Sequence, residues 1–86
     1  MNLTFTPSAW KDYQWLLEQD RKLLKRVNQL IQEVLRTPFE GIGKPEPLKG
    51  DLSGSWSRRI TEEHRLIYLV KAHVLVAIAC RYHYSD

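Results

Sequence analysis

The fold is decided by the last third of the chain, residues 56–84, WSRRITEEHRLIYLVKAHVLVAIACRYHY. Apolar side chains alternate there with a period of two, which predicts strands over Trp56–Thr61, His64–Val70 and His73–Tyr84. Their connections are only two residues long, and strands joined so closely must run antiparallel. The segment therefore predicts a three-stranded antiparallel meander.

The third of these strands changes character along its length. Alternation places Val74, Val76, Ile78, Cys80, Tyr82 and Tyr84 on one face, and Leu75, Ala77, Ala79, Arg81 and His83 on the other. Its apolar part ends abruptly, so polar and aromatic groups from the last residues are expected at the edge of the sheet.

The first 38 residues predict a strand and two helices. Leu3 and Phe5 alternate with polar neighbours as in a half-buried strand, and Thr6 is a helix N-cap followed by proline. A first helix is expected from there to about Glu18, with an apolar stripe of Ala9, Trp10, Tyr13, Leu16 and Leu17. A second helix begins after Asp20 and ends before Pro38. We expect an α+β fold: an N-terminal strand, two helices, then an antiparallel meander, with the helices packed on one face of the sheet.

Composition excludes several classes of protein. With 86 residues, 43% of them hydrophobic, the chain fits one globular domain, and its single cysteine has no partner for a disulfide. The longest apolar run, Val74–Cys80, is far shorter than the roughly 20 residues of a membrane span. The N-terminus lacks the pattern of a signal peptide, so a cytoplasmic protein without membrane contact is expected. The net charge of +3 suits a polyanionic partner, although many small proteins are as basic.

Residues 37–55 predict a long loop, because they contain three prolines and four glycines. Long ordered loops on compact scaffolds are often functional. If Pro45 to Lys49 is extended like polyproline, with three residues per turn, Glu46 and Lys49 project on the same side.

The sequence contains no recognisable metal-binding or cofactor-binding motif. The three histidines and one cysteine show no paired ligand spacing, and no glycine-rich phosphate loop is present, so no cofactor or metal is expected. Cys80 lies in an apolar strand, where packing is expected rather than reactivity.

Three arginines, Arg58, Arg59 and Arg65, flank one predicted turn. Glu62 and Glu63 could neutralise them in a solvated salt-bridge cluster. Alternatively, they form a phosphate clamp, because the planar guanidinium matches phosphate oxygens.

A carboxylate beside a cation, opposite arginine and histidine, is the set needed to cleave RNA by internal attack. One group removes the proton of the 2′-hydroxyl, another protonates the departing 5′-oxygen, and fixed cations stabilise the transition state. From spacing alone, this set competes with an ordinary solvated surface.

Five groups of residues form a distinctive pattern: the run 36–49 with its proline-flanked Glu46, Leu-Ser-Gly at 52–54, Trp-Ser-Arg-Arg-Ile at 56–60, Glu-His-Arg-Leu at 63–66, and Cys-Arg-Tyr-His-Tyr at 80–84. In this pattern the chain resembles the YoeB toxins of the RelE/ParE superfamily of bacterial toxin–antitoxin systems. The resemblance spans nearly the whole chain and is densest from residue 36 onward.

The resemblance implies one toxin domain over residues 1–86 with the RelE-like fold. It implies a metal-independent endoribonuclease that enters the ribosomal A site and cuts the mRNA codon there, which stops translation. The roles it implies are Glu46 as general base, His83 as general acid, Arg65 as stabiliser of the transition-state phosphate, Lys49 and Arg59 as phosphate-holding cations, and Tyr84 as the residue that orients the scissile nucleotide.

The partners implied by the resemblance are a YefM-type antitoxin with an acidic, flexible C-terminal segment, the 70S ribosome with its mRNA, and a second copy of the chain in a homodimer. Two other functions stay open. One is a ParE-like toxin that binds DNA gyrase without RNA chemistry, which would not need Glu46, Arg65 and His83 together. The other is a non-catalytic RNA-binding module, whose effect would survive His83→Ala.

Overall fold

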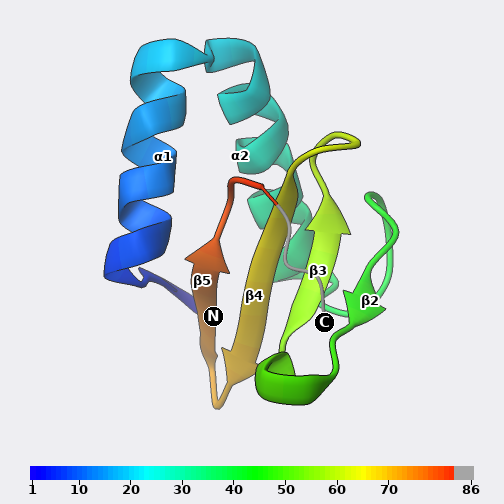
Figure 1. Ribbon diagram of the computed structural model, residues 1–86. Coiled ribbons are helices and arrows are strands. Elements are labelled where there is room, and N and C mark those ends of the chain that lie inside the picture. Colours follow the sequence, from blue (N-terminus) through cyan, green and yellow to red (C-terminus); the bar gives the residue numbers. More distant parts are fainter. Residues whose placement is uncertain (83–86) are drawn as a thin grey trace.

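A computed structural model describes residues 1–82 (Figure 1). In chain order its elements are β1 (Asn2–Phe5), α1 (Pro7–Gln19), α2 (Arg21–Arg36), β2 (Glu46–Pro47), the 3-10 helix η1 (Gly50–Leu52), β3 (Trp56–Arg59), β4 (Arg65–Lys71) and β5 (Val74–Ala79). The predicted α+β order is confirmed, and the expected loop contains two further short elements.

Both helices begin where the sequence predicts. The Thr6 hydroxyl accepts a hydrogen bond from the backbone N–H of Ala9, and the Asp20 carboxylate accepts one from that of Leu23. Each cap satisfies a backbone donor that the first helical turn leaves free. The Thr6 hydroxyl also donates to the carbonyl of Ile78, so the start of α1 is tied to β5.

The sheet has five strands in the order β1-β5-β4-β3-β2. The predicted antiparallel meander is confirmed in β3, β4 and β5, and β2 adds to its outer edge in the antiparallel sense. The strand β1 runs parallel to β5, with Asn2 opposite Val74 and Phe5 opposite Ala77. The sheet is therefore mixed.

The core lies between the helices and one face of the sheet, and in Figure 1 the strands β3 and β4 pass in front of α2. Its buried residues are Leu16, Leu24, Val27, Leu30, Ile31, Val34, Ile60, Leu66, Tyr68, Leu75 and Cys80. The helices thus cover one face, as predicted. The apolar stripe expected on α1 is confirmed at Ala9 and Leu16, which are buried. It was wrong at Trp10 and Leu17, which are exposed.

The strand β5 is shorter than predicted, and its alternation is interrupted. Tyr68 pairs with Ala77, but the preceding Ile67 pairs with Ala79, so β5 has one extra residue at this point. Such a bulge shifts the side-chain phase by one position. Leu75 and Cys80 consequently both belong to the core, although strict alternation had placed them on opposite faces. The strand ends at Ala79.

No helix within residues 1–82 is long and apolar enough to cross a membrane.

Candidate functional site

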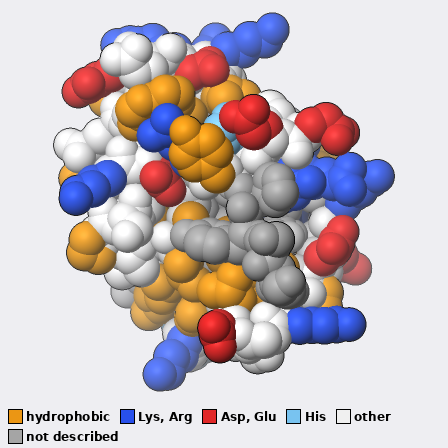
Figure 2. Space-filling view, in the orientation of Figure 1, with side chains coloured by type: hydrophobic (Ala, Val, Ile, Leu, Met, Phe, Trp, Pro, Cys, Tyr) orange, Lys and Arg blue, Asp and Glu red, His pale blue; other side chains and the backbone are white. Residues whose placement is uncertain are grey.

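Three of the expected site residues lie on the face of the sheet opposite the helices. In β3 and β4 the helix side is taken by Trp56, Leu66 and Tyr68, so the residues between them project to the other side. We call this side the distal face, and it carries Glu46, Ser57, Arg59, Arg65 and Ile67. Lys and Arg side chains and Asp and Glu side chains are interspersed along the margin on the side of β2 and β3 (Figure 2).

The strand register fixes how these residues are arranged. Glu46 lies opposite Ser57, which lies opposite Ile67, and in the next row Arg59 lies opposite Arg65. Side chains directly opposite in an antiparallel pair have Cβ atoms about 5 Å apart, and diagonal neighbours are about 7–8 Å apart. The structure therefore brings Glu46, Arg59 and Arg65 together around Ser57.

Arg65 is held by the turn between β3 and β4. Its Nη1 donates to the carbonyl oxygens of Thr61 (2.6 Å), Glu62 (3.1 Å) and His64 (3.1 Å). Within residues 1–82 neither Nε nor Nη2 donates to a protein acceptor, so these two nitrogens are available to a ligand as far as the described chain is concerned. The turn carbonyls thus orient the guanidinium and leave its charge uncancelled.

The solvated salt-bridge cluster, one of the two arrangements considered for this turn, is not found in the described chain. Among residues 1–82 no ion pair joins Arg58, Arg59 or Arg65 to Glu62 or Glu63. The carboxylate of Glu63 lies instead 3.3 Å from Nε2 of His64. Two arginines directly opposite each other repel unless an anion lies between them, so the pair Arg59–Arg65 favours an anionic ligand.

The backbone of Arg59 is fixed from two sides. Its N–H donates to the carbonyl of Gly43 at 2.6 Å, and its own carbonyl accepts from Nη2 of Arg26 at 3.4 Å. Gly43 has φ of +82°, and a Cβ there would lie 2.9 Å from Cδ2 of Leu30 and 3.3 Å from the carbonyl oxygen of Arg59. Only glycine permits this approach without a shift. The loop and β3 are therefore in direct contact beside the site.

Glu46 is exposed at the start of β2, between two prolines. Glu46–Pro47 pairs with β3 as a strand and does not form the expected polyproline-type turn. The three-residue period that placed Lys49 beside Glu46 consequently does not apply. The backbone of Lys49 lies at the end of β2 that points away from Arg59 and Arg65, as the exposed N-cap of η1. The backbone of Lys49 therefore lies apart from those of Arg59 and Arg65.

Arg58 is the clearest departure from the expected phosphate clamp. Its side chain is completely buried on the helix side. Nε donates to the Tyr68 hydroxyl (3.2 Å), and the two Nη atoms donate to the carbonyls of Ile42 (3.1 Å), Glu40 (2.8 Å) and Thr37. The Tyr68 hydroxyl donates in turn to the carbonyl of Pro38 at 2.7 Å. Arg58 therefore holds the loop rather than a ligand.

Burial affects two titratable groups beneath the sheet. Burial raises the pKa of Tyr68, and the nearby Arg58 lowers it by a smaller amount. Burial, and secondarily the charge of Asp12, raises the pKa of Cys80 to about 12. A buried thiol with so high a pKa is protonated at neutral pH, so Cys80 is packed rather than nucleophilic, as expected.

His83 and Tyr84, the expected general acid and nucleotide-orienting residue, lie outside the described residues. The chain leading to them is described as far as Tyr82. The guanidinium of Arg81 lies 3.5 Å above the ring of Trp15, which anchors this segment to α1.

Sequence reasoning missed the role of His64. It is buried, and its Nδ1 accepts a hydrogen bond of 2.7 Å from the backbone N–H of Tyr82. The only signal in the sequence was its place next to Arg65.

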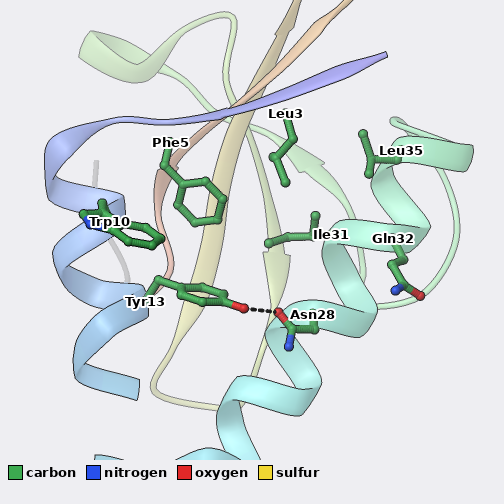
Figure 3. Close-up of a pocket in the computed structure, with 8 residues that line it drawn as sticks. All are labelled: Leu3, Phe5, Trp10, Tyr13, Asn28, Ile31, Gln32 and Leu35. Carbon is green, nitrogen blue, oxygen red and sulfur yellow. Dashed lines mark hydrogen bonds between the residues drawn. The ribbon is translucent and has the colours of Figure 1, made fainter. Parts of the chain in front are cut away.

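An apolar groove of about 450 Å³ lies elsewhere, between β1 and the two helices. Figure 3 shows Phe5, Trp10 and Tyr13 on one side and Asn28 and Ile31 of α2 on the other. The Tyr13 hydroxyl donates to Oδ1 of Asn28 at 2.8 Å. None of Glu46, Lys49, Arg59 and Arg65, the expected site residues that the structure describes, lines this groove.

Among residues 1–82, no group of three His, Cys, Asp or Glu side chains is arranged to hold a metal ion.

The fold and the distal-face arginines define a small α+β protein with a candidate anion site, and comparison with known proteins identifies its family. The family model described as "YoeB-like toxin of bacterial type II toxin-antitoxin system" matches residues 5–84. The chain is 56% identical to Toxin YoeB of Synechocystis sp. over 85 residues, covering 99% of each chain. It is also 56% identical to Toxin YoeB of Escherichia coli K12, covering 98% of this chain and 100% of that protein.

The solved structures agree. A YoeB/ParE toxin from Agrobacterium tumefaciens superimposes with a TM-score of 0.95 at 50% identity, over 98% of this chain and 100% of that one. The YoeB-YefM complex from Staphylococcus aureus gives 0.90 at 44% identity, over 98% of both chains. The chain belongs to the YoeB-like toxins of bacterial type II toxin–antitoxin systems.

Proposed function

We propose that this toxin is a ribosome-dependent endoribonuclease that cuts mRNA in the A site. The observation that carries the proposal is the pair Arg59–Arg65, which are directly opposite on the distal face with Glu46 in the neighbouring row. Two guanidinium groups that form no ion pair within residues 1–82 suit a phosphodiester, and the exposed carboxylate of Glu46 beside them suits a proton acceptor.

The reaction would be an internal attack by the RNA itself. Glu46 takes the proton of the 2′-hydroxyl as its oxygen attacks the adjacent phosphorus. The bond to the 5′-oxygen breaks, and His83 donates a proton to that leaving oxygen. The products are a 2′,3′-cyclic phosphate, which water can open to a 3′-phosphate, and a 5′-hydroxyl. DNA would be inert because it lacks the nucleophile.

The cations would act on the charge that develops on the phosphate. Arg65 is oriented in advance by three turn carbonyls, so its remaining donors need no rearrangement to bind phosphate oxygens. Arg59 adds a second guanidinium from the opposite strand. Lys49 would act at the edge, on a flanking phosphate, because its backbone lies at the other end of β2. Tyr84 would stack on a base of the codon.

The partners follow from the relatives. Solved relatives include a YoeB-YefM complex and a YoeB dimer, both from Staphylococcus aureus. We infer a YefM-type antitoxin and a homodimer for this chain, with the 70S ribosome and mRNA as the target. The reaction would take place in the cytoplasm and would need no cofactor. One domain spanning residues 1–86 would carry it out.

The experiment is end mapping on a defined mRNA, with purified protein and with or without translating ribosomes. We expect one cut within the A-site codon and a cyclic phosphate or 3′-phosphate end. Arg65→Ala should abolish the cut, whereas Lys71→Ala, which removes a charge from the far end of β4, should not. If folded wild-type protein produces no cut, the proposal is overturned, and inhibition of DNA gyrase is the activity to assay next.

A further inference from the structure

The residue that immediately precedes His83 is held by two backbone hydrogen bonds. The N–H of Tyr82 donates to Nδ1 of His64 at 2.7 Å, and the carbonyl of Tyr82 accepts from the N–H of Arg65, also at 2.7 Å. The neighbouring residues His64 and Arg65 therefore bind both backbone polar groups of one residue, Tyr82. We call these two contacts the Tyr82 clamp.

The ring of His64 is suited to this task only in one tautomer. Nδ1 can accept a hydrogen bond only when it carries no proton, so the proton of the neutral ring is on Nε2. Nε2 lies 3.3 Å from a carboxylate oxygen of Glu63, which favours the proton at that position. The ring is buried and packs beside the Tyr82 ring, with 5.4 Å between centroids. Its orientation is thus set by the hydrogen bond at Nδ1 and by packing against Tyr82.

The clamp holds a backbone conformation that is unfavourable by itself. Tyr82 has φ of +60°, in the left-handed region, where a non-glycine residue needs support from its surroundings. This conformation turns the chain directly after Cys80 and Arg81. Since Tyr82 is bonded covalently to His83, the clamp fixes the residue from which the chain continues to His83.

We propose that His64 is a positioning residue for the reaction. Through Nδ1 it fixes the backbone of Tyr82 and so places the start of the segment with His83 and Tyr84 relative to Arg65. This inference rests on the proposed ribonuclease function. General acid catalysis requires the donor within hydrogen-bond reach of the leaving oxygen, and a small displacement lowers the rate steeply.

Two substitutions of His64 distinguish the effect of its hydrogen bond to Tyr82 from the effect of filling the space that its side chain occupies. His64→Leu fills the site but has no acceptor. His64→Asn returns one, because its Oδ1 is bonded to Cγ as Nδ1 is in histidine. His73→Asn, in the exposed turn between β4 and β5, controls for loss of a histidine. Val34→Ala, in the core on α2, controls for loss of stability alone.

Three measurements are made on the full-length protein. Nitrogen-15 spectra of the imidazoles report the tautomer of His64. Hydrogen exchange reports protection of the Tyr82 amide. Single-turnover cleavage on programmed ribosomes gives a maximal rate constant and the protein concentration for half-maximal rate.

We expect the Nε2–H tautomer in the wild type. His64→Leu should speed exchange of the Tyr82 amide and lower the maximal rate at least about tenfold, with little change in the half-maximal concentration. His64→Asn should restore both. His73→Asn should behave as wild type, and Val34→Ala should lower Tm without lowering the maximal rate.

The clamp is disproved if Tyr82 exchange is the same in His64→Leu, or if His64→Asn is no better than His64→Leu. The positioning role is disproved if exchange rises and the rate does not fall. If the wild type does not cleave RNA, the proposed function and the positioning role fail together, while the tautomer and exchange measurements still decide whether the clamp exists.

Discussion

The Nε atom of Arg58 donates a 3.2 Å hydrogen bond to the hydroxyl oxygen of Tyr68, on the helix side of two neighbouring strands. From this pair, donors reach four loop carbonyls, those of Thr37, Pro38, Glu40 and Ile42. The loop that they hold leads directly into β2, where Glu46 lies. The pair therefore supports the site from beneath the sheet without touching a ligand.

Arg58→Leu and Arg59→Leu should differ strongly in their effect on stability, although the two residues are adjacent. Arg58→Leu removes a completely buried guanidinium and leaves the carbonyls of Thr37, Glu40 and Ile42 without its hydrogen bonds, so it should lower the free energy of unfolding by at least about 3 kcal/mol. Arg59→Leu alters a distal-face side chain and should change that free energy by less than about 1 kcal/mol. Urea unfolding of both variants measures the difference, and equal losses would contradict the assignment of Arg58 to the scaffold.

Gly43→Ala should destabilise the protein more than Gly54→Ala. Both glycines have positive φ, so alanine is strained at either position by about 1 kcal/mol. At Gly43 the new Cβ would also lie 2.9 Å from Leu30 and close to the Arg59 carbonyl, whereas at Gly54 nothing lies within 4 Å. We expect an additional loss of about 1–2 kcal/mol at Gly43, measured by thermal unfolding. Equal shifts in Tm would mean that the contact with β3 is looser than described.

Stability should fall as the pH rises above the ordinary thiol pKa of 9.0, because the pKa of Cys80 is about 12 in the folded protein. Above pH 9.0 the unfolded chain has lost its thiol proton while the folded chain keeps it, so the unfolded state binds fewer protons. The slope approaches about 1.4 kcal/mol per pH unit for this one group.

The measurement is the free energy of unfolding of the wild type and Cys80→Ala from pH 8 to pH 11. Tyr68, whose pKa burial also raises, contributes in the same direction to both proteins, so the difference between their slopes isolates Cys80. If the free energy of unfolding has the same pH dependence in both proteins, the raised pKa of Cys80 is disproved. The native thiol should also resist iodoacetamide until urea unfolds the protein.

Glu46→Gln should lower the single-turnover rate of cleavage on the order of 100- to 10,000-fold, the usual contribution of a general base. Its exposure means that folding should be unaffected, which a Tm equal to that of the wild type would confirm. The matched control is Glu18→Gln, at an exposed position of α1 away from the distal face. If folded Glu46→Gln cleaves RNA at the wild-type rate, Glu46 is not the general base.

The meander and both helices could be predicted because their signals are local: alternation, N-caps, and a proline after α2. The partner of β1 could not, since nothing in residues 2–5 specifies pairing with β5. No sequence pattern predicts the bulge opposite Tyr68 either. Because of this bulge, Cys80 lies on the opposite face of the sheet from the one that strict alternation predicts. Both features depend on contacts between distant residues.

The site shows the same division. Arg58 and Arg59 are chemically identical neighbours, and strand alternation predicts that they face opposite sides without saying which side is buried. Only the packed helices decide that Arg58 holds carbonyls and that Arg59 joins Arg65. The prediction for Lys49 was wrong in its geometry because pairing with β3 replaced the assumed polyproline period. His83 and Tyr84 stay predictions.

The parallel pairing of β1 with β5 has a consequence for the order in which the toxin matures. Within residues 1–82 the first strand in chain order pairs with the last one, and the Thr6–Ile78 hydrogen bond spans 72 residues of chain. Contacts of such separation form late in folding. A chain that stops before β5 lacks the strand with which β1 pairs. The finished sheet should therefore form only when β5 becomes available to β1.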